Sequence, residues 1–165
     1  MTDTHTLPNP LFHHILVGYD GSENAKRALD YGIKAAQAND ARLTVMSVVT
    51  EVSGLVAYAG TTPADLEEEA HEEVGAELAA AVAAMPPGLA VTTVIQHGRS
   101  GPRLASYAAS HEVDLVIVGN RGRGTLRSAL LGSVTEHLIH AQVAPVLVIP
   151  ADQQARAGAD RIRSL

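Results

Sequence analysis

The sequence predicts an α/β fold in which a five-stranded parallel sheet carries helices on both faces. Five short apolar segments alternate along the chain with four segments whose apolar residues recur at helical spacing. Hydrophobic residues make up 46% of the 165 residues but aromatic residues only 3%, so the core must be built from Val, Ile, Leu and Ala. Side chains of this kind suit helices packed against a parallel sheet.

The first half of the chain carries turn chemistry at the expected element ends. Asp20-Gly21-Ser22 follows the first apolar run as a turn and a helix N-cap, and Pro63 is suited to the first turn of a helix. Pro86-Pro87-Gly88 stops that second helix. We therefore expect strands over residues 14–20 and 42–49, and helices over residues 22–39 and 63–85.

The second half continues the same alternation. Pro102 is tolerated in the first turn of a third helix, and Gly132-Ser133 precedes a fourth. The expected strands cover residues 89–96, 113–118 and 145–149, and the expected helices cover residues 100–112 and 133–141. In open parallel sheets, ligands bind beyond the carboxyl ends of the strands, where the winding direction reverses.

Length and composition limit the classes of function. The chain fits one domain over residues 13–150, with a flexible leader at 1–12 and a polar tail at 151–165. The formal net charge of −6 argues against a nucleic-acid partner. The absence of cysteine excludes disulfides and thiolate metal sites. With no signal peptide and no long apolar run to suggest a membrane, we expect a cytoplasmic protein.

The segment from Gly119 to Ser133 has the parts of a phosphate cradle. Its glycines allow close approach of the backbone to an anion, and Ser133 stands at an expected helix start, where free amides favour phosphate. Arg121 and Arg123 add local positive charge. The residues alone leave a structural alternative open, because Ser133 and Glu136 also have the spacing of a capping box.

The glycine spacing resembles that of a known family. Gly119, Gly122 and the pair Gly132-Ser133 match the Gly-x2-Gly-x9-Gly-Ser/Thr motif of ATP-binding universal stress proteins, and the strands near residues 15–22, 114–119 and 145–150 also resemble that family. The resemblance covers residues 13–150. It implies a Rossmann-like, adenine nucleotide alpha-hydrolase-like sheet with strand order 3-2-1-4-5.

The resemblance also implies a set of nucleotide contacts. Asp20 would lie near the ribose, the phosphates and a divalent ion such as Mg²⁺, unless it only caps the helix that begins near Ser22. Val48, more than Val49, would meet the adenine edge. The full set of cofactor-binding residues that it implies is Gly18, Asp20, Val48, Val118, Gly119, Gly122, Gly132, Ser133 and Val134.

These features lead us to expect an ATP-binding module, with Mg²⁺ as the accompanying ion and with Asp20 as its ligand, rather than an efficient ATPase. Three alternatives remain: a slow ATP hydrolase, a cAMP-binding protein, and a nucleotide-free interaction protein of the same fold. The resemblance implies a homodimer through the edge strand at residues 145–150. The loop at residues 50–62 is expected to close over the adenine side.

Two further groups carry weaker signals. The acidic run between Asp65 and Glu77 is expected to be the solvated face of the second helix rather than a metal site. His137 and His140 share a helix face but lack an evident third ligand, so we expect surface histidines there.

Overall fold

The computed structural model describes residues 10–50, 62–120 and 132–150. Within them, five strands alternate with four helices, and their ends differ from the expected ones by no more than two residues. The elements are β1 (His14–Gly18), α1 (Glu23–Asn39), β2 (Arg42–Val49), α2 (Pro63–Ala83), β3 (Val91–His97), α3 (Ser100–Ser110), β4 (Leu115–Gly119), α4 (Ser133–Ala141) and β5 (Val146–Ile149).

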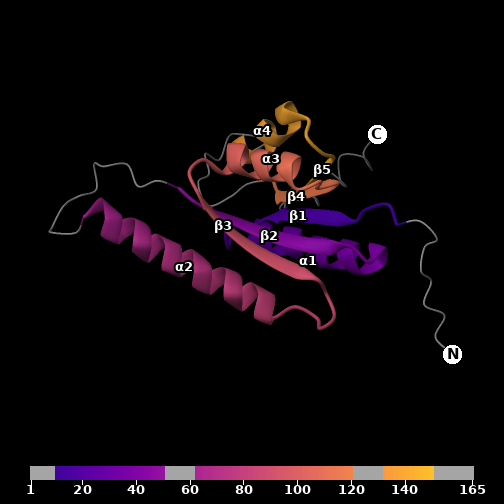
Figure 1. Ribbon diagram of the computed structural model, residues 1–165, viewed down its shortest axis with the longest axis horizontal. Helices are drawn as coiled ribbons and strands as arrows, with labels where there is room; N and C mark the ends of the chain where they lie inside the picture. The colour runs from indigo at the N-terminus through magenta and orange to yellow at the C-terminus, as the bar shows by residue number, and fades with distance from the viewer. Residues whose placement is uncertain (1–9, 51–61, 121–131, 151–165) are drawn as a thin grey trace, which may run out of the picture.

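The strands form one parallel sheet with the order β3-β2-β1-β4-β5, as expected. Helices α3 and α4 lie on one face of this sheet, while α1 and α2 lie on the other (Figure 1). The core is correspondingly divided in two. Ile15 and Val17 of β1 face the α1–α2 layer, and Leu16 faces the α3–α4 layer. Because successive strand residues point to opposite faces, a buried strand is apolar at every position.

Side-chain caps explain where the first two helices begin. Ser22 is the N-cap of α1, and its hydroxyl accepts a hydrogen bond from the Ala25 amide at 3.2 Å. Thr62 and Asp65 form a reciprocal capping box at the start of α2. The acidic residues of α2 are exposed or half-buried, so the run is a solvated helix face, as expected. No helix within the described ranges is long and apolar enough to span a bilayer.

A close contact between α1 and the sheet depends on Gly32. A Cβ atom at this buried position would lie 2.5 Å from Cγ2 of Val17. Gly75 of α2 gives a matched comparison, since a Cβ atom there would meet Cδ1 of Ile95 at an ordinary 3.7 Å.

We expect Gly32→Ala to be less stable than Gly75→Ala by about 1–3 kcal/mol, the usual cost of overfilling a packed core. Both substitutions gain the same helix propensity, so the difference in free energy of unfolding isolates the crowding against Val17. Urea denaturation of the two variants measures this difference. Equal stability would contradict the close helix–sheet contact.

A buried histidine joins β1 to two neighbouring segments. The His111 carbonyl can only accept a hydrogen bond, so Nδ1 of His14 donates to it over 2.9 Å. Nε2 of the neutral ring then accepts from the Thr44 hydroxyl at 2.8 Å. The Asp114 carboxylate also accepts the main-chain amides of His13 and His14. Burial lowers the pKa of His14 below its ordinary value of 6.5.

This lowered pKa predicts a pH dependence of stability. Below about pH 6.5 the unfolded chain takes up a proton at His14 before the folded chain does, so stability falls with decreasing pH. His14→Gln removes the titrating group, and we expect it to flatten the decline in unfolding free energy between pH 7.5 and pH 5. The exposed His140→Gln is the control and should keep the wild-type slope. An unchanged slope in His14→Gln would contradict the assignment.

Candidate functional site

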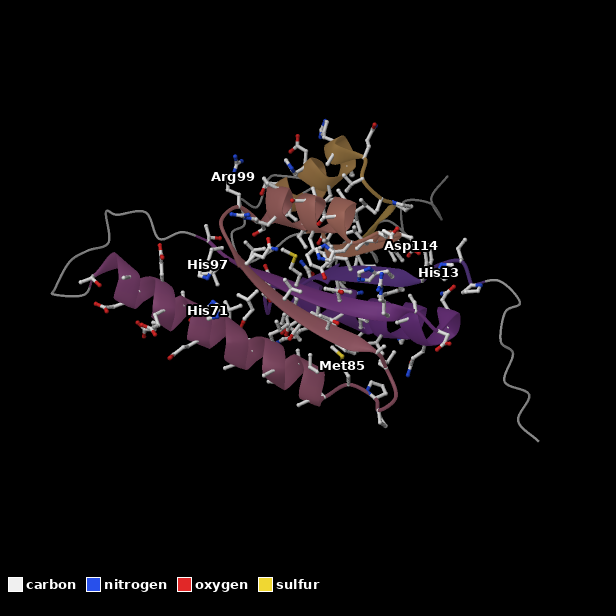
Figure 2. The ribbon with its side chains drawn as sticks, in the orientation of Figure 1. His13, His71, Met85, His97, Arg99 and Asp114 are labelled. Carbon is white, nitrogen blue, oxygen red and sulfur yellow. The ribbon has the colours of Figure 1, made fainter. Side chains whose placement is uncertain are left out.

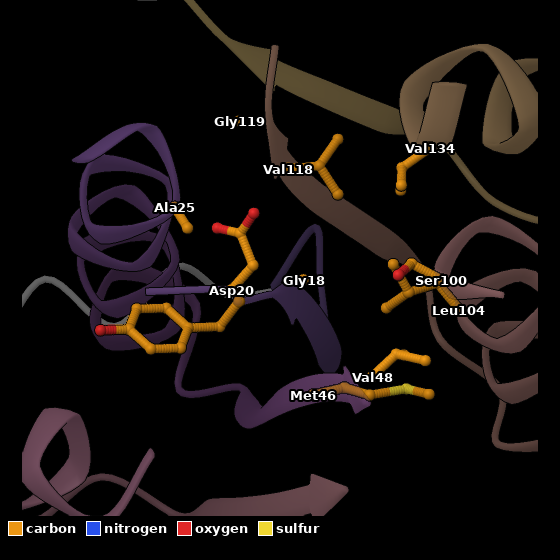
Figure 3. Close-up of a pocket in the computed structure, with 11 residues that line it drawn as sticks. Gly18, Asp20, Ala25, Met46, Val48, Ser100, Leu104, Val118, Gly119 and Val134 are labelled. Carbon is orange, nitrogen blue, oxygen red and sulfur yellow. The ribbon is translucent and has the colours of Figure 1, made fainter. Parts of the chain in front are cut away.

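A hollow opens at the carboxyl ends of β1, β2 and β4, between α1 on one side and α3 with α4 on the other (Figure 3). It encloses about 480 Å³ of space including the solvent at its mouth. Small-molecule sites commonly lie where the winding of a parallel sheet reverses. The lining residues are Gly18, Tyr19, Asp20, Ala25, Met46, Val48, Ser100, Leu104, Val118, Gly119 and Val134.

Main-chain pairing beyond the end of β1 fixes one side of the hollow. The Tyr19 amide donates to the Met46 carbonyl at 2.9 Å, and the Ser47 hydroxyl donates to the Tyr19 carbonyl at 2.7 Å. The next residue, Asp20, accepts a hydrogen bond from the Ser22 amide at 3.1 Å. Asp20 is thus held at the mouth of the hollow by the turn that starts α1.

The opposite side of the hollow is an apolar slot. Met46 and Val48 come from β2, Leu104 from α3, Val118 from β4 and Val134 from α4. In Figure 3 the carboxylate of Asp20 lies across the hollow from Met46, Val48 and Leu104. The hydroxyl of Ser100 lies beside Leu104 and is the polar side-chain group at the slot end. The described lining is therefore apolar at one end and carries a carboxylate at the other.

The end of β4 is held tightly against the start of α1. A Cβ atom at Gly119 would lie 2.7 Å from Cβ and 3.0 Å from the carbonyl carbon of Asn24. The next residue, Asn120, donates its amide to the Ile149 carbonyl and accepts the Gly132 amide, each at 2.9 Å. The first glycine of the motif therefore has a packing role, and the two flanks of segment 121–131 are joined by a main-chain hydrogen bond.

The start of α4 differs from the capping-box alternative. The N-cap is Gly132, with extended backbone, and no side chain of the described residues caps the helix. Ser133 is the first helical residue, so its hydroxyl does not occupy the cap position and the Ser133–Glu136 box is not formed. The first main-chain bond of the helix runs from the Glu136 amide to the Gly132 carbonyl at 3.0 Å. Amides of an uncapped first turn suit an anion.

The structure brings most of the expected nucleotide-binding residues together. Those that line the hollow are Gly18, Asp20, Val48, Val118, Gly119 and Val134. Val49 is buried in the core instead. Gly132 and Ser133 lie directly before Val134 at the start of α4. Gly122, Arg121, Arg123 and most of the loop at residues 50–62 lie outside the described residues.

Sequence reasoning missed five lining residues: Tyr19, Ala25, Met46, Ser100 and Leu104. Met46 had a signal, because it precedes Val48 by two positions and so points to the same sheet face. Ser100 and Leu104 are four apart on α3 and share a helix face. The tertiary fold decides which part of α3 reaches the hollow, so no local sequence pattern could identify Ser100 and Leu104 as lining residues.

The described residues hold no group of three or more His, Cys, Asp or Glu side chains placed to share a metal ion. His140 places Nδ1 2.8 Å from the Glu136 carbonyl of its own helix, while His137 packs where a Cβ of Gly101 would lie. Both are exposed, in line with the expectation of surface histidines.

The family model described as the universal stress protein family matches residues 11–150. The chain belongs to the universal stress protein family. A universal stress protein of Mycolicibacterium smegmatis is 34% identical over 148 residues, which cover 86% of this chain and 49% of the relative. The chain thus spans about half the length of that curated relative.

Solved structures of the family share the fold. A universal stress protein family structure from Burkholderia pseudomallei is 30% identical with a TM-score of 0.69, covering 87% of this chain and 100% of that one. A universal stress protein solved in complex with cAMP is 24% identical with a TM-score of 0.54, covering 84% of this chain and 96% of that one. The second likeness concerns the fold alone.

Proposed function

We propose that this universal stress protein is a regulatory module that binds ATP in the hollow between β1, β2 and β4. The observation that carries the proposal is the polarity of the described lining. An apolar slot able to enclose a base faces a mouth that carries Asp20 and lies near the uncapped start of α4. A nucleotide has the same polarity, with a flat apolar base at one end and phosphates at the other.

The slot favours one orientation of the nucleotide. The base would lie among Met46, Val48 and Leu104, within reach of the Ser100 hydroxyl. The ribose and phosphates would then extend toward Asp20 and the first-turn amides of Ser133 and Val134. This orientation also agrees with the spacing of the glycine motif.

The site suits Mg²⁺ only in company with the nucleotide. Asp20 is the one carboxylate in the described lining. Mg²⁺ is commonly held by one or two carboxylates together with substrate phosphates, so Asp20 fits that ion without a dedicated protein cage. Bound Mg²⁺ would offset phosphate charge beside the carboxylate.

The described lining favours binding over catalysis. It contains no Lys, Arg or His side chain, whereas phosphoryl transfer is usually accelerated by positioned cationic groups. We therefore propose a binding role, with slow hydrolysis as the alternative. Because one universal stress protein was solved in complex with cAMP, the affinity for cAMP should be compared with that for ATP. A nucleotide-free interaction role is disfavoured by the intact glycine motif.

Equilibrium titration with ATP and Mg²⁺ tests the proposal. Asp20→Asn keeps an oxygen that can accept the Ser22 amide but removes the charge, and we expect it to weaken ATP binding by roughly 10- to 100-fold, as for a hydrogen bond to a charged group. Ser100→Ala removes a neutral partner and should weaken binding by about 2- to 10-fold. Isothermal calorimetry measures both changes.

Asp30→Asn is the control, because Asp30 is an exposed carboxylate of α1 outside the hollow. It should bind ATP as the wild type does. Titration with cAMP and ADP in the same series shows how the affinity depends on the phosphates, since the three nucleotides share the adenine base. Identification of any nucleotide released when the purified protein is denatured gives an independent result. No binding of any adenine nucleotide by the wild type would overturn the proposal.

We also propose that the protein is a homodimer through β5. This strand is at one edge of the sheet, where the described residues offer its main-chain groups no further strand to pair with. Its Leu147 is 40% exposed, although it stands between apolar neighbours in a strand. A second copy laid along residues 145–150 would cover both the edge and this side chain.

Leu147→Asp should convert a dimer into a monomer, because it places a carboxylate in the proposed contact. Its present exposure means that the fold itself should tolerate the change. Tyr31→Asp is the matched control, since Tyr31 is 50% exposed and belongs to α1 rather than to the edge strand. Light scattering coupled to size exclusion measures the mass. A monomeric wild type at micromolar concentration, or a dimeric Leu147→Asp, would contradict the proposal.

A further inference from the structure

A pair of histidines outside the described lining of the hollow connects helix α2 to the end of strand β3. Nδ1 of His71 lies 3.1 Å from Nε2 of His97, and the two rings are parallel to within 3°. Both residues are exposed, and Figure 2 shows them next to each other, one from each element. Among the described residues, neither ring has another hydrogen bond or ion pair.

This pair lies where α2 has few other attachments. Leu78 is the one buried side chain of the described residues of α2, and it belongs to the second half of the helix. From Ala64 to Gly75 the described side chains are exposed or half-buried. The hydrogen bond between His71 and His97 therefore joins the sheet to the more weakly packed half of the helix.

We propose that His71 and His97 together bind a divalent transition-metal ion of the copper–zinc class, which fastens α2 to the end of β3. Imidazole nitrogens lie about 2.0–2.1 Å from such ions, so two ligands on one ion are roughly 2.9–3.4 Å apart for bond angles from square to tetrahedral. The observed 3.1 Å falls in this range. Both rings bind the ion as neutral imidazoles: the ring that donates the hydrogen bond carries its proton on its other ring nitrogen instead, and each ring turns so that its lone pair points at the ion rather than at the other ring.

The surroundings define the kind of site. Water completes the coordination, because no third ligand is placed with the pair among the described residues. Glu67 and Glu68 precede His71 by four and three positions, so they lie on the same side of α2 and add negative potential. Arg103 donates Nε to the His97 carbonyl at 2.8 Å, which anchors the main chain at the end of β3. Two neutral nitrogens with water make an exchangeable site, and Cu²⁺ is the divalent ion that such ligands hold most tightly.

Titration of the full, nucleotide-free chain with Cu²⁺ tests this proposal. Calorimetry gives the affinity, and electron paramagnetic resonance counts the nitrogens bound to the metal. We expect one Cu²⁺ with two nitrogen ligands, and a loss of affinity of about tenfold or more in His71→Ala and in His97→Ala. Hydrogen exchange provides a second readout: Cu²⁺ should slow the exchange of the amides of residues 64–75 in the wild type but not in these variants.

The double variant with His137→Gln and His140→Gln is the matched control, because it removes two exposed histidines that lie three residues apart in α4. It should bind Cu²⁺ as the wild type does. The proposal is wrong if His71→Ala binds as tightly as the wild type, if affinity is lost in the control instead, or if Cu²⁺ leaves the exchange of α2 unchanged. ATP binding is measured separately, so the two proposals can fail independently.

Discussion

Strands β1 and β4 lie side by side at the middle of the sheet, with Val17 paired to Ile117, although about a hundred residues separate them in the chain. The helix that follows β1, α1, lies on one face of the sheet. The helix that follows β4, α4, lies on the opposite face. Two strands that are hydrogen-bonded to each other cannot separate, so the diverging connections leave a crevice above them. The hollow lies in that crevice, and its described lining comes from the ends of the strands and from the helices around it.

The same arrangement holds the polar groups of the site in place before any ligand arrives. Main-chain bonds continue past β1 to Met46 and past β4 to Ile149, and Gly119 allows α1 to approach within contact distance of β4. Asp20 is oriented by the turn at Ser22. Helix α4 begins after the Gly132 cap, and no side chain of the described residues caps its first turn. Groups fixed by backbone pairing lose little conformational entropy when a ligand binds, which favours affinity.

Much of the fold and part of the candidate site could be predicted from local sequence patterns, and the exceptions have physical causes. Turn and proline chemistry at Ser22 and Pro63 located the helices, while the strand order came from the resemblance of the glycine motif to a family. The start of α4 at Ser133 was predicted, but the capping box stayed an open alternative because the pattern does not show which of Gly132 and Ser133 takes the extended backbone. Ser100 in the hollow and the His71–His97 pair were missed since each depends on segments that meet only in the folded chain.

A crystal structure of the protein grown with ATP and Mg²⁺ tests the central claim most directly, since it locates the ligand against every wall of the hollow. The account predicts the base between Met46, Val48 and Leu104, the ribose beside Asp20, and the phosphates at the start of α4. Density for the nucleotide elsewhere on the molecule, or a slot closed by the protein's own side chains despite saturating ATP, would contradict it.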